Sequence, residues 1–136
     1  MKEEKHEEAL KEVFDEIESA SKDKEGLKSH QRRLIFMLSL GASTMIELYF
    51  HKLDIIKEGS KIDHRWFKKN NENVKKQLES QITTHIENIE NINEIIKLTR
   101  SIEEKRDDLT YGAPAEEKIL QEKINLFFKL KELAKC

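Results

Sequence analysis

The most apolar stretch of this chain covers residues 34–56, and drawn as a helix it is apolar on more than one face. Apolar side chains and one glycine recur at helical spacings of three, four or seven residues along its main stripe: Leu34, Leu38, Gly41, Met45, Tyr49 and Ile56. A helix that is apolar nearly all round is usually central in its domain. The pattern therefore predicts a long buried helix, from about residue 27 to residue 58, around which the other helices pack.

The second face of this helix mixes large apolar side chains with polar ones: Phe36, Leu40, Ser43, Glu47, Phe50 and Asp54. Apart from the broad last helix, the chain offers no obvious element to cover this face, so we expect a subunit seam or a cleft wall there. Two interpretations of Glu47 stay open. Either it pairs with an arginine such as Arg32 to close the bundle or a dimer seam, or it holds the guanidinium of Arg106.

The remaining apolar pattern predicts helices on both sides of the central one. An amphipathic helix is expected over residues 2–22, and Asp63 is a good N-cap for a third helix, with Ile62 and Phe67 spaced as a hydrophobic staple. One long helix is expected from about residue 80 to Gly112, because no Pro or Gly interrupts it, and a last one over residues 114–134. Residues 1–136 are therefore predicted to form an all-α, single-domain bundle of four to five helices.

Composition narrows the classes of function. Charged residues make up 38% of the chain and the net charge is −2, with acidic and basic residues interspersed. A large positively charged surface that could bind duplex nucleic acid is therefore not expected, although a small phosphate-binding site remains an alternative. The single cysteine, Cys136, excludes an internal disulfide, and residues 34–50 are too short and too polar for a membrane span. We expect a soluble, cytoplasmic protein with no membrane contact.

Arg106 is the first candidate for chemistry, because it continues the apolar stripe of Leu98, Ile102 and Leu109. An unpaired buried charge is costly, so Arg106 either has a partner, faces a cavity or interface, or reaches water at the end of its helix. The five histidines include no H-x3-H or H-E-x-x-H pair, and the glycines are isolated. Neither a metal site nor a cofactor is predicted.

The segment from Glu104 to Gly112, EKRDDLTYG, resembles the HEPN superfamily of small helical-bundle proteins. That family carries an Arg near the end of a long helix, then a few polar residues, then a His or Tyr, here Arg106 and Tyr111. The stretch GASTMIELYFHKL resembles the family's long second helix, in which an acidic residue recurs, here Glu47. Residues 61–69 are also similar, so the resemblance spans most of the chain.

The resemblance implies a dimer and, in many members, a metal-independent ribonuclease of a toxin–antitoxin or defence system. The family's active site is formed by Arg-x4–6-His across the dimer seam. This sequence departs from the pattern, because no His follows Arg106 and Tyr111 occupies the position of the His. A phenol with a pKa of about 10 is a poor base at neutral pH, so binding is favoured over cleavage.

Three hypotheses about function stay open. The first is a HEPN-like homodimer that binds RNA or a nucleotide in a cleft lined by Arg106, Tyr111, Glu47 and Asp107 or Asp108. In a ribonuclease of this kind, Arg106 would stabilise the charge on the phosphorane, and Tyr111 or a carboxylate would handle protons. The second is a non-enzymatic interaction module that pairs with a nucleotidyltransferase-like or antitoxin partner. The third is a ligand-binding bundle unrelated to HEPN.

Overall fold

A computed structural model describes residues 3–135, and every regular element in that range is helical. Four longer helices form the bundle: α1 (Glu3–Lys22), α2 (Gln31–Lys52), α4 (Ile92–Glu103) and α6 (Glu117–Leu133). Two short helices, α3 (Asn71–Glu79) and α5 (Arg106–Tyr111), and the 3-10 turns η1 (Leu27–His30), η2 (His64–Lys68) and η3 (Ile86–Asn88) complete it. The predicted all-α bundle with a long buried second helix is confirmed. Met1, Lys2 and Cys136 lie outside the described residues.

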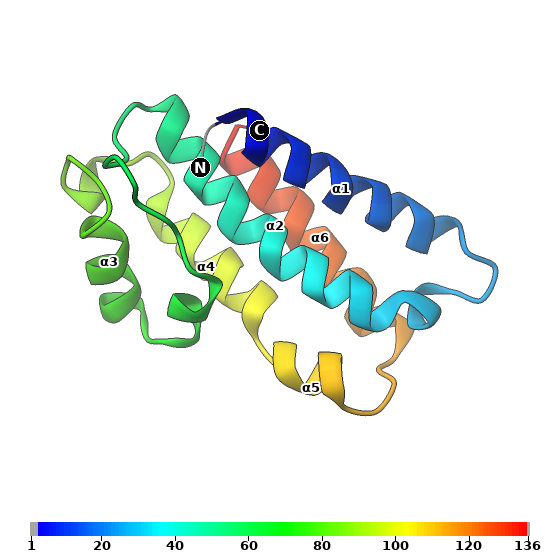
Figure 1. Cartoon of the computed structure of the whole chain (residues 1–136). Coiled ribbons are helices and arrows are strands. Elements are labelled where there is room, and N and C mark those ends of the chain that lie inside the picture. The colour runs from blue at the N-terminus through cyan, green and yellow to red at the C-terminus, as the bar shows by residue number, and fades with distance from the viewer. Residues whose placement is uncertain (1–2, 136) are drawn as a thin grey trace.

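α2 is the axis of the bundle and lies between α1, α4, α5 and α6 (Figure 1). Gly41 allows the closest approach, since a Cβ atom there would lie 2.8 Å from the Phe127 ring and 3.0 Å from Val13. The segment over residues 27–52 is long and apolar enough to cross a membrane by length and composition. However, 78% of its most apolar window is buried inside the bundle, and this burial accounts for its composition.

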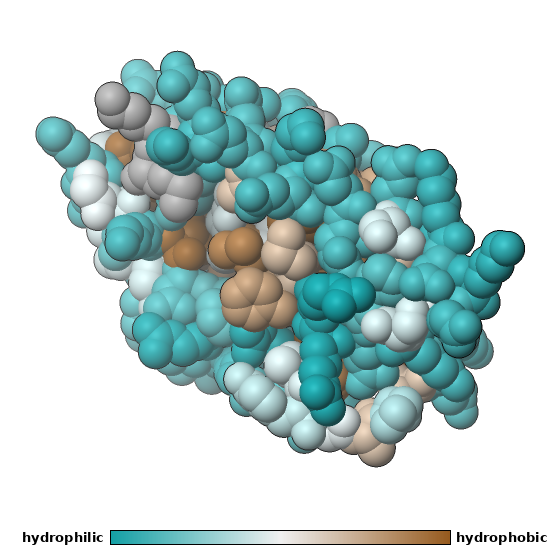
Figure 2. All heavy atoms as spheres, turned by 45° about the vertical axis from the view of Figure 1, so that its right-hand side comes forward, coloured by the Kyte–Doolittle hydropathy of each residue, from teal (hydrophilic) through white to brown (hydrophobic). Residues whose placement is uncertain are grey.

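The second face of α2 divides into an exposed half and a buried half. Phe36 and Leu40 are 50% and 38% exposed, and Figure 2 shows a patch of apolar side chains between α1 and α5, where α2 comes to the surface. Glu47 and Phe50 are buried, because the chain that follows α2 folds back over them and the Ile62 amide donates to Glu47. The expected seam or cleft wall is therefore wrong for the second half of this face.

α2 also ends earlier than its composition predicts. Asp54 adopts a left-handed backbone conformation with φ 56°, and the chain leaves the helix there. Residues 55–57 then pair with residues 81–83 through backbone hydrogen bonds, including Thr83 N to Ile55 O at 2.7 Å. This distant pairing satisfies backbone groups that a longer helix would have satisfied locally.

The long helix expected over residues 80–112 is wrong, because the chain breaks twice within that range. Asn91 and Lys105 adopt left-handed conformations, with φ 64° and φ 60°, immediately before α4 and α5. The Lys123 ammonium of α6 donates to the carbonyl oxygens of Ser101 and Glu104, which the end of α4 leaves without helical partners. The second break is thus held by a contact between α4 and α6.

The expected start of the third helix is confirmed at its cap and corrected in its form. The Asp63 carboxylate accepts a hydrogen bond from the Arg65 amide at 2.9 Å, and Phe67 is fully buried. The turn that follows is the 3-10 helix η2, and α3 begins only after Asn70, whose side chain caps it. This hinge places η2 against α4, and α3 contacts both η2 and α4.

Candidate functional site

Arg106 is the first residue of α5, directly after the break that Lys123 holds. Its Nε atom donates to the Ser39 hydroxyl at 3.1 Å, and its guanidinium lies over the Phe36 ring, 5.8 Å from the ring centroid. Its side chain is only 13% exposed. The structure thus shows that Arg106 has partners on α2, rather than extending freely into solvent at the end of a helix.

Behind Arg106, a buried carboxylate links three helical elements. The Ser39 hydroxyl donates to Glu103 Oε1, while Glu103 Oε2 lies 3.3 Å from His64 Nδ1 in η2. Glu103 is almost fully buried, so its charge is compensated mainly by these neighbours. Arg106, Ser39, Glu103 and His64 therefore form one continuous polar network, which we call the Arg106 network.

The sequence interpretation missed three members of this network. Glu103 lies on the buried stripe of α4 with Ile95, Ile96 and Thr99, and a carboxylate on such a stripe is the signal that could have revealed it. Ser39 and His64 gave no comparable signal, since a serine in an apolar helix and a histidine after a cap are ordinary.

Glu103 and Arg106 of this network line a groove of about 1010 Å³ between α4, the start of α5 and the η2–α3 segment. Six basic side chains line the groove: Lys68, Lys75, Lys97, Arg100, Lys105 and Arg106. Six acidic side chains line it as well: Glu72, Glu94, Glu103, Glu104, Asp107 and Asp108. The groove therefore carries both signs of charge: its basic side chains attract an anion and its acidic side chains repel it.

Two features of the groove favour an anion at the end nearest to Arg106. Asp107 lies between Lys68, at 3.0 Å, and Arg106, at 3.3 Å, and these cations, Lys68 first, hold the pKa of Asp107 below its usual range. Arg100 donates to Asn71 through Nη1, but its buried Nε atom has no hydrogen-bond partner within the described residues. A buried donor without a partner is costly, which makes it a candidate contact for a bound oxyanion.

The structure brings together only part of the predicted site. Arg106, Asp107 and Asp108 line the groove together, as expected from their adjacency. Tyr111 is 78% exposed at the far end of α5 and does not line this groove. Arg32 is exposed too and faces a separate hollow beside Gly112 and Pro114.

Neither of the two open interpretations of Glu47 holds within the described residues, because its hydrogen-bond partners are not arginines. Arg106 reaches α2 at Ser39, whereas Glu47 lies about two turns further along α2 and contacts His6 and the Ile62 amide instead. Eight residues of α-helix span about 12 Å, so an Arg106 side chain held at Ser39 does not also reach Glu47. Glu47 belongs to a second buried cluster with His6 and His51.

Comparison with protein-family models, with curated proteins and with solved structures finds no match for this chain. The geometry of the groove and of the two buried clusters therefore carries the functional argument.

Proposed function

We propose that this chain is a HEPN-like bundle that binds a phosphate-bearing ligand, a single-stranded RNA or a nucleotide, in the groove that Arg106 lines. The observation that carries the proposal is the fixed position of the Arg106 guanidinium. Ser39 and Phe36 hold it from α2, so it loses little further conformational freedom when it binds an oxyanion. Its planar fork of donors matches two phosphate oxygens.

The neighbouring cations support the same ligand class. A phosphate beside Arg106 can replace the Asp107 carboxylate as the partner of Lys68, and Arg100 offers its unpaired Nε atom on the same wall. Because acidic side chains match the basic ones in number, only a few phosphates fit favourably. A nucleotide or a short single-stranded segment suits this balance better than a duplex.

Fluorescence anisotropy tests the proposal with a labelled single-stranded RNA and, in a separate arm, a fluorescent ATP analogue, both in EDTA. We expect Arg106→Ala to weaken binding about 10-fold or more, since a charge-assisted hydrogen bond contributes roughly 1.5–3 kcal/mol. For RNA, the slope of log affinity against log salt should fall by about 0.7.

Lys118→Ala on the exposed face of α6 is the matched control, and it should leave binding unchanged. Binding in only one arm identifies the source of the phosphate. Absence of binding in both arms, or equal losses in Arg106→Ala and Lys118→Ala, contradicts the proposal.

The proposed assembly is a homodimer that pairs through the exposed half of α2. Phe36 and Leu40 present apolar surface there, beside the Arg106 network (Figure 2). A two-fold axis through this patch would bring Arg106 of both copies near the seam, and a self-complementary patch is what a two-fold interface requires. The HEPN resemblance supports the same arrangement.

A metal-independent ribonuclease is the second candidate function, and the His64–Glu103 contact favours it. A buried carboxylate beside Nδ1 fixes the tautomer and orientation of an imidazole, which is how a general base is commonly prepared. His64 is joined to Arg106 through Glu103 and Ser39, so a base and a phosphate-binding cation share one network. His64 would then supply the base that the sequence lacks after Arg106.

Cleavage of labelled RNA in EDTA, followed on denaturing gels, tests this activity. We expect His64→Ala and Arg106→Ala each to abolish cleavage, while His85→Ala, which alters an exposed histidine, retains it. Cleavage that survives in both network variants would come from a contaminating nuclease and would leave binding as the sole function of the groove.

A further inference from the structure

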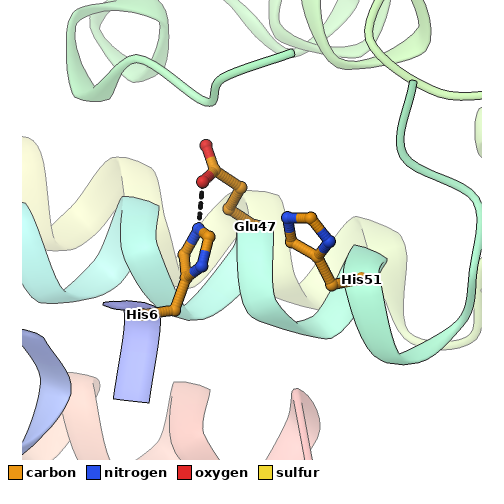
Figure 3. Close-up of side chains that lie close together, drawn as sticks. All are labelled: His6, Glu47 and His51. Carbon is orange, nitrogen blue, oxygen red and sulfur yellow. Dashed lines mark hydrogen bonds and ion pairs between the residues drawn. The ribbon is translucent and has the colours of Figure 1, made fainter. Parts of the chain in front are cut away.

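A second polar cluster lies deep in the bundle, where α1 crosses the last turns of α2. His6 of α1 and Glu47 and His51 of α2 each offer a ligand atom, and these atoms all lie within 4.8 Å of one another. Glu47 and His51 are four residues apart, so they lie on the same face of α2. Figure 3 shows His6 rising from α1 toward the Glu47 carboxylate, with His51 one turn further along α2.

The cluster is more than a buried ion pair between His6 and Glu47. Glu47 Oε2 contacts His6 Nε2, and Glu47 Oε1 accepts the Ile62 amide at 2.8 Å, so the carboxylate is fixed from both sides. His51 lies beside this pair, with its ring centroid 5.0 Å from that of His6. Its Nε2 atom is buried and has no hydrogen-bond partner within the part of the chain that the structure describes. An ion pair alone does not explain a second imidazole with an unsatisfied buried nitrogen.

His51 also connects the cluster to solvent. It lines an open hollow whose other walls carry five carboxylates and one lysine: Glu3, Glu4, Glu7, Asp54, Glu58 and Lys57. A surface of this charge concentrates cations at its mouth. A cation in the hollow therefore meets His51 first and the buried carboxylate behind it.

We propose that His6, Glu47 and His51 form a binding site for a divalent transition-metal ion of the Zn²⁺ class. Two imidazoles and one carboxylate suit Zn²⁺ and its neighbours, whereas Mg²⁺ and Ca²⁺ prefer sites made of oxygen atoms. The three ligand atoms lie within 4.8 Å of one another, and binding requires each of them to come to roughly 2.0–2.2 Å from the ion. The ion replaces the contact between His6 and Glu47, and the Ile62 amide remains to orient the carboxylate.

Three protein ligands leave one position of a four-coordinate ion unfilled. Three protein ligands with a free fourth position are the arrangement in which a bound water or a small ligand completes the metal shell. The site lies apart from the groove at Arg106 and does not rest on the function proposed for it. Its ligands come from two helices, so metal binding also links the start of α1 to the end of α2.

Titration of the EDTA-stripped and dialysed full chain with Zn²⁺, by calorimetry or by competition with a chromophoric chelator, tests the site. We expect one ion per chain, and about 100-fold weaker binding in His51→Ala, the ligand variant whose partly exposed position makes it the least disruptive to folding. His85→Ala removes an exposed histidine and should bind as the wild type does. Co²⁺ in place of Zn²⁺ should give visible absorption bands of a low-coordinate site in the wild type and in His85→Ala, but not in His51→Ala.

Glu47→Gln supplies an independent check, because it alters a second proposed ligand and should also weaken Zn²⁺ binding. Circular dichroism confirms that this variant keeps its helical content. Zn²⁺ should raise the Tm of the wild type and of His85→Ala but not that of His51→Ala. Two outcomes overturn the proposal. One is no stoichiometric binding to the folded wild type, and the other is equal binding by the wild type and His51→Ala, which marks adventitious surface binding.

Discussion

At the scale of single residues, His30 is a histidine whose contacts stabilise the fold and do not form part of the proposed binding sites. Its ring contacts two carboxylates, with Nδ1 at 2.8 Å from Glu16 and Nε2 at 2.7 Å from Asp23. Hydrogen bonds from Glu16 and then Asp23 raise the pKa of His30 above its ordinary value. The pKa of Asp23 is lowered by the Glu25 amide and by His30. Folding therefore favours the protonated form of the His30 imidazole relative to the unfolded chain.

This cluster predicts a pH-dependent contribution to stability. Because the pKa of His30 is raised on folding, its contribution is fully present below about pH 6.5 and is lost as the pH rises through the folded value. The Asp23 contribution has the opposite sign and is lost only in acid, below about pH 4. In urea unfolding, His30→Gln should therefore lower the free energy of unfolding most near pH 5.5 and leave it almost unchanged at high pH.

His85→Gln is the control at an exposed histidine, and its unfolding free energy should follow that of the wild type at every pH. A loss in His30→Gln that stays constant from acid to alkaline pH would mean that His30 stabilises the fold in its neutral form.

At the scale of elements, the position of α5 decides what Arg106 can contact. Lys123 of α6 holds the end of α4, and Gln31 at the start of α2 holds the other end of α5. The Gln31 amide donates to the Leu109 carbonyl at 2.8 Å, and its oxygen accepts the Ala115 amide at 2.8 Å. Hydrogen bonds from two longer helices therefore fix α5 and the chain that leads into it. A helix as short as α5 has little stability of its own.

Lys123→Met is the change that tests this dependence. The substitution keeps an apolar stem but leaves the Ser101 and Glu104 carbonyls without their donor, so we expect a loss of about 1–3 kcal/mol in unfolding free energy. RNA or nucleotide binding should weaken as well, because Arg106 follows this break directly. The loss of unfolding free energy is smaller than it would be for a freely charged lysine, because burial lowers the pKa of Lys123 and disfavours its charged form.

Lys129→Met, at an exposed position of the same helix, should change neither property. Urea unfolding and the anisotropy assay measure both variants side by side. A destabilised Lys123→Met that binds with unchanged affinity would show that Arg106 keeps its place without the α6 contact.

At the scale of the whole molecule, the exposed half of α2 predicts the oligomeric state. Leu40→Glu places a charge in the middle of the proposed seam without removing a partner of Arg106, so it should shift a dimer to a monomer. Size-exclusion chromatography with light scattering measures the mass. Ile119→Glu is a matched control, since Ile119 is 39% exposed and Leu40 is 38% exposed.

A wild-type chain that remains a monomer at every concentration would contradict the proposed homodimer. The apolar patch would then fit the alternative, in which a different protein, such as a nucleotidyltransferase-like or antitoxin partner, covers it.

The sequence by itself determined the helical class, the burial of α2, the cap at Asp63 and the stop at Gly112. Each of these follows from local physics: hydrophobic periodicity, a side chain that satisfies its own helix end, and a helix-breaking residue. The sequence singled out Arg106 by its place on the stripe of Leu98, Ile102 and Leu109, although that stripe crosses the break at Lys105. Asp107 and Asp108 line the groove with it because residues adjacent in sequence stay close in space.

Only the tertiary structure decided the breaks at Asn91 and Lys105 and the partners of the buried polar groups. Left-handed residues and an early helix end are tolerated where distant groups satisfy the freed backbone, as Lys123 does at the end of α4. Ser39 and Glu103 are separated by 64 residues, and His6 and Glu47 by 41. Periodicity within one helix places each side chain on a face, but it does not say which other helix packs against that face. The Arg106 network and the His6–Glu47–His51 cluster therefore exist only in the packed bundle.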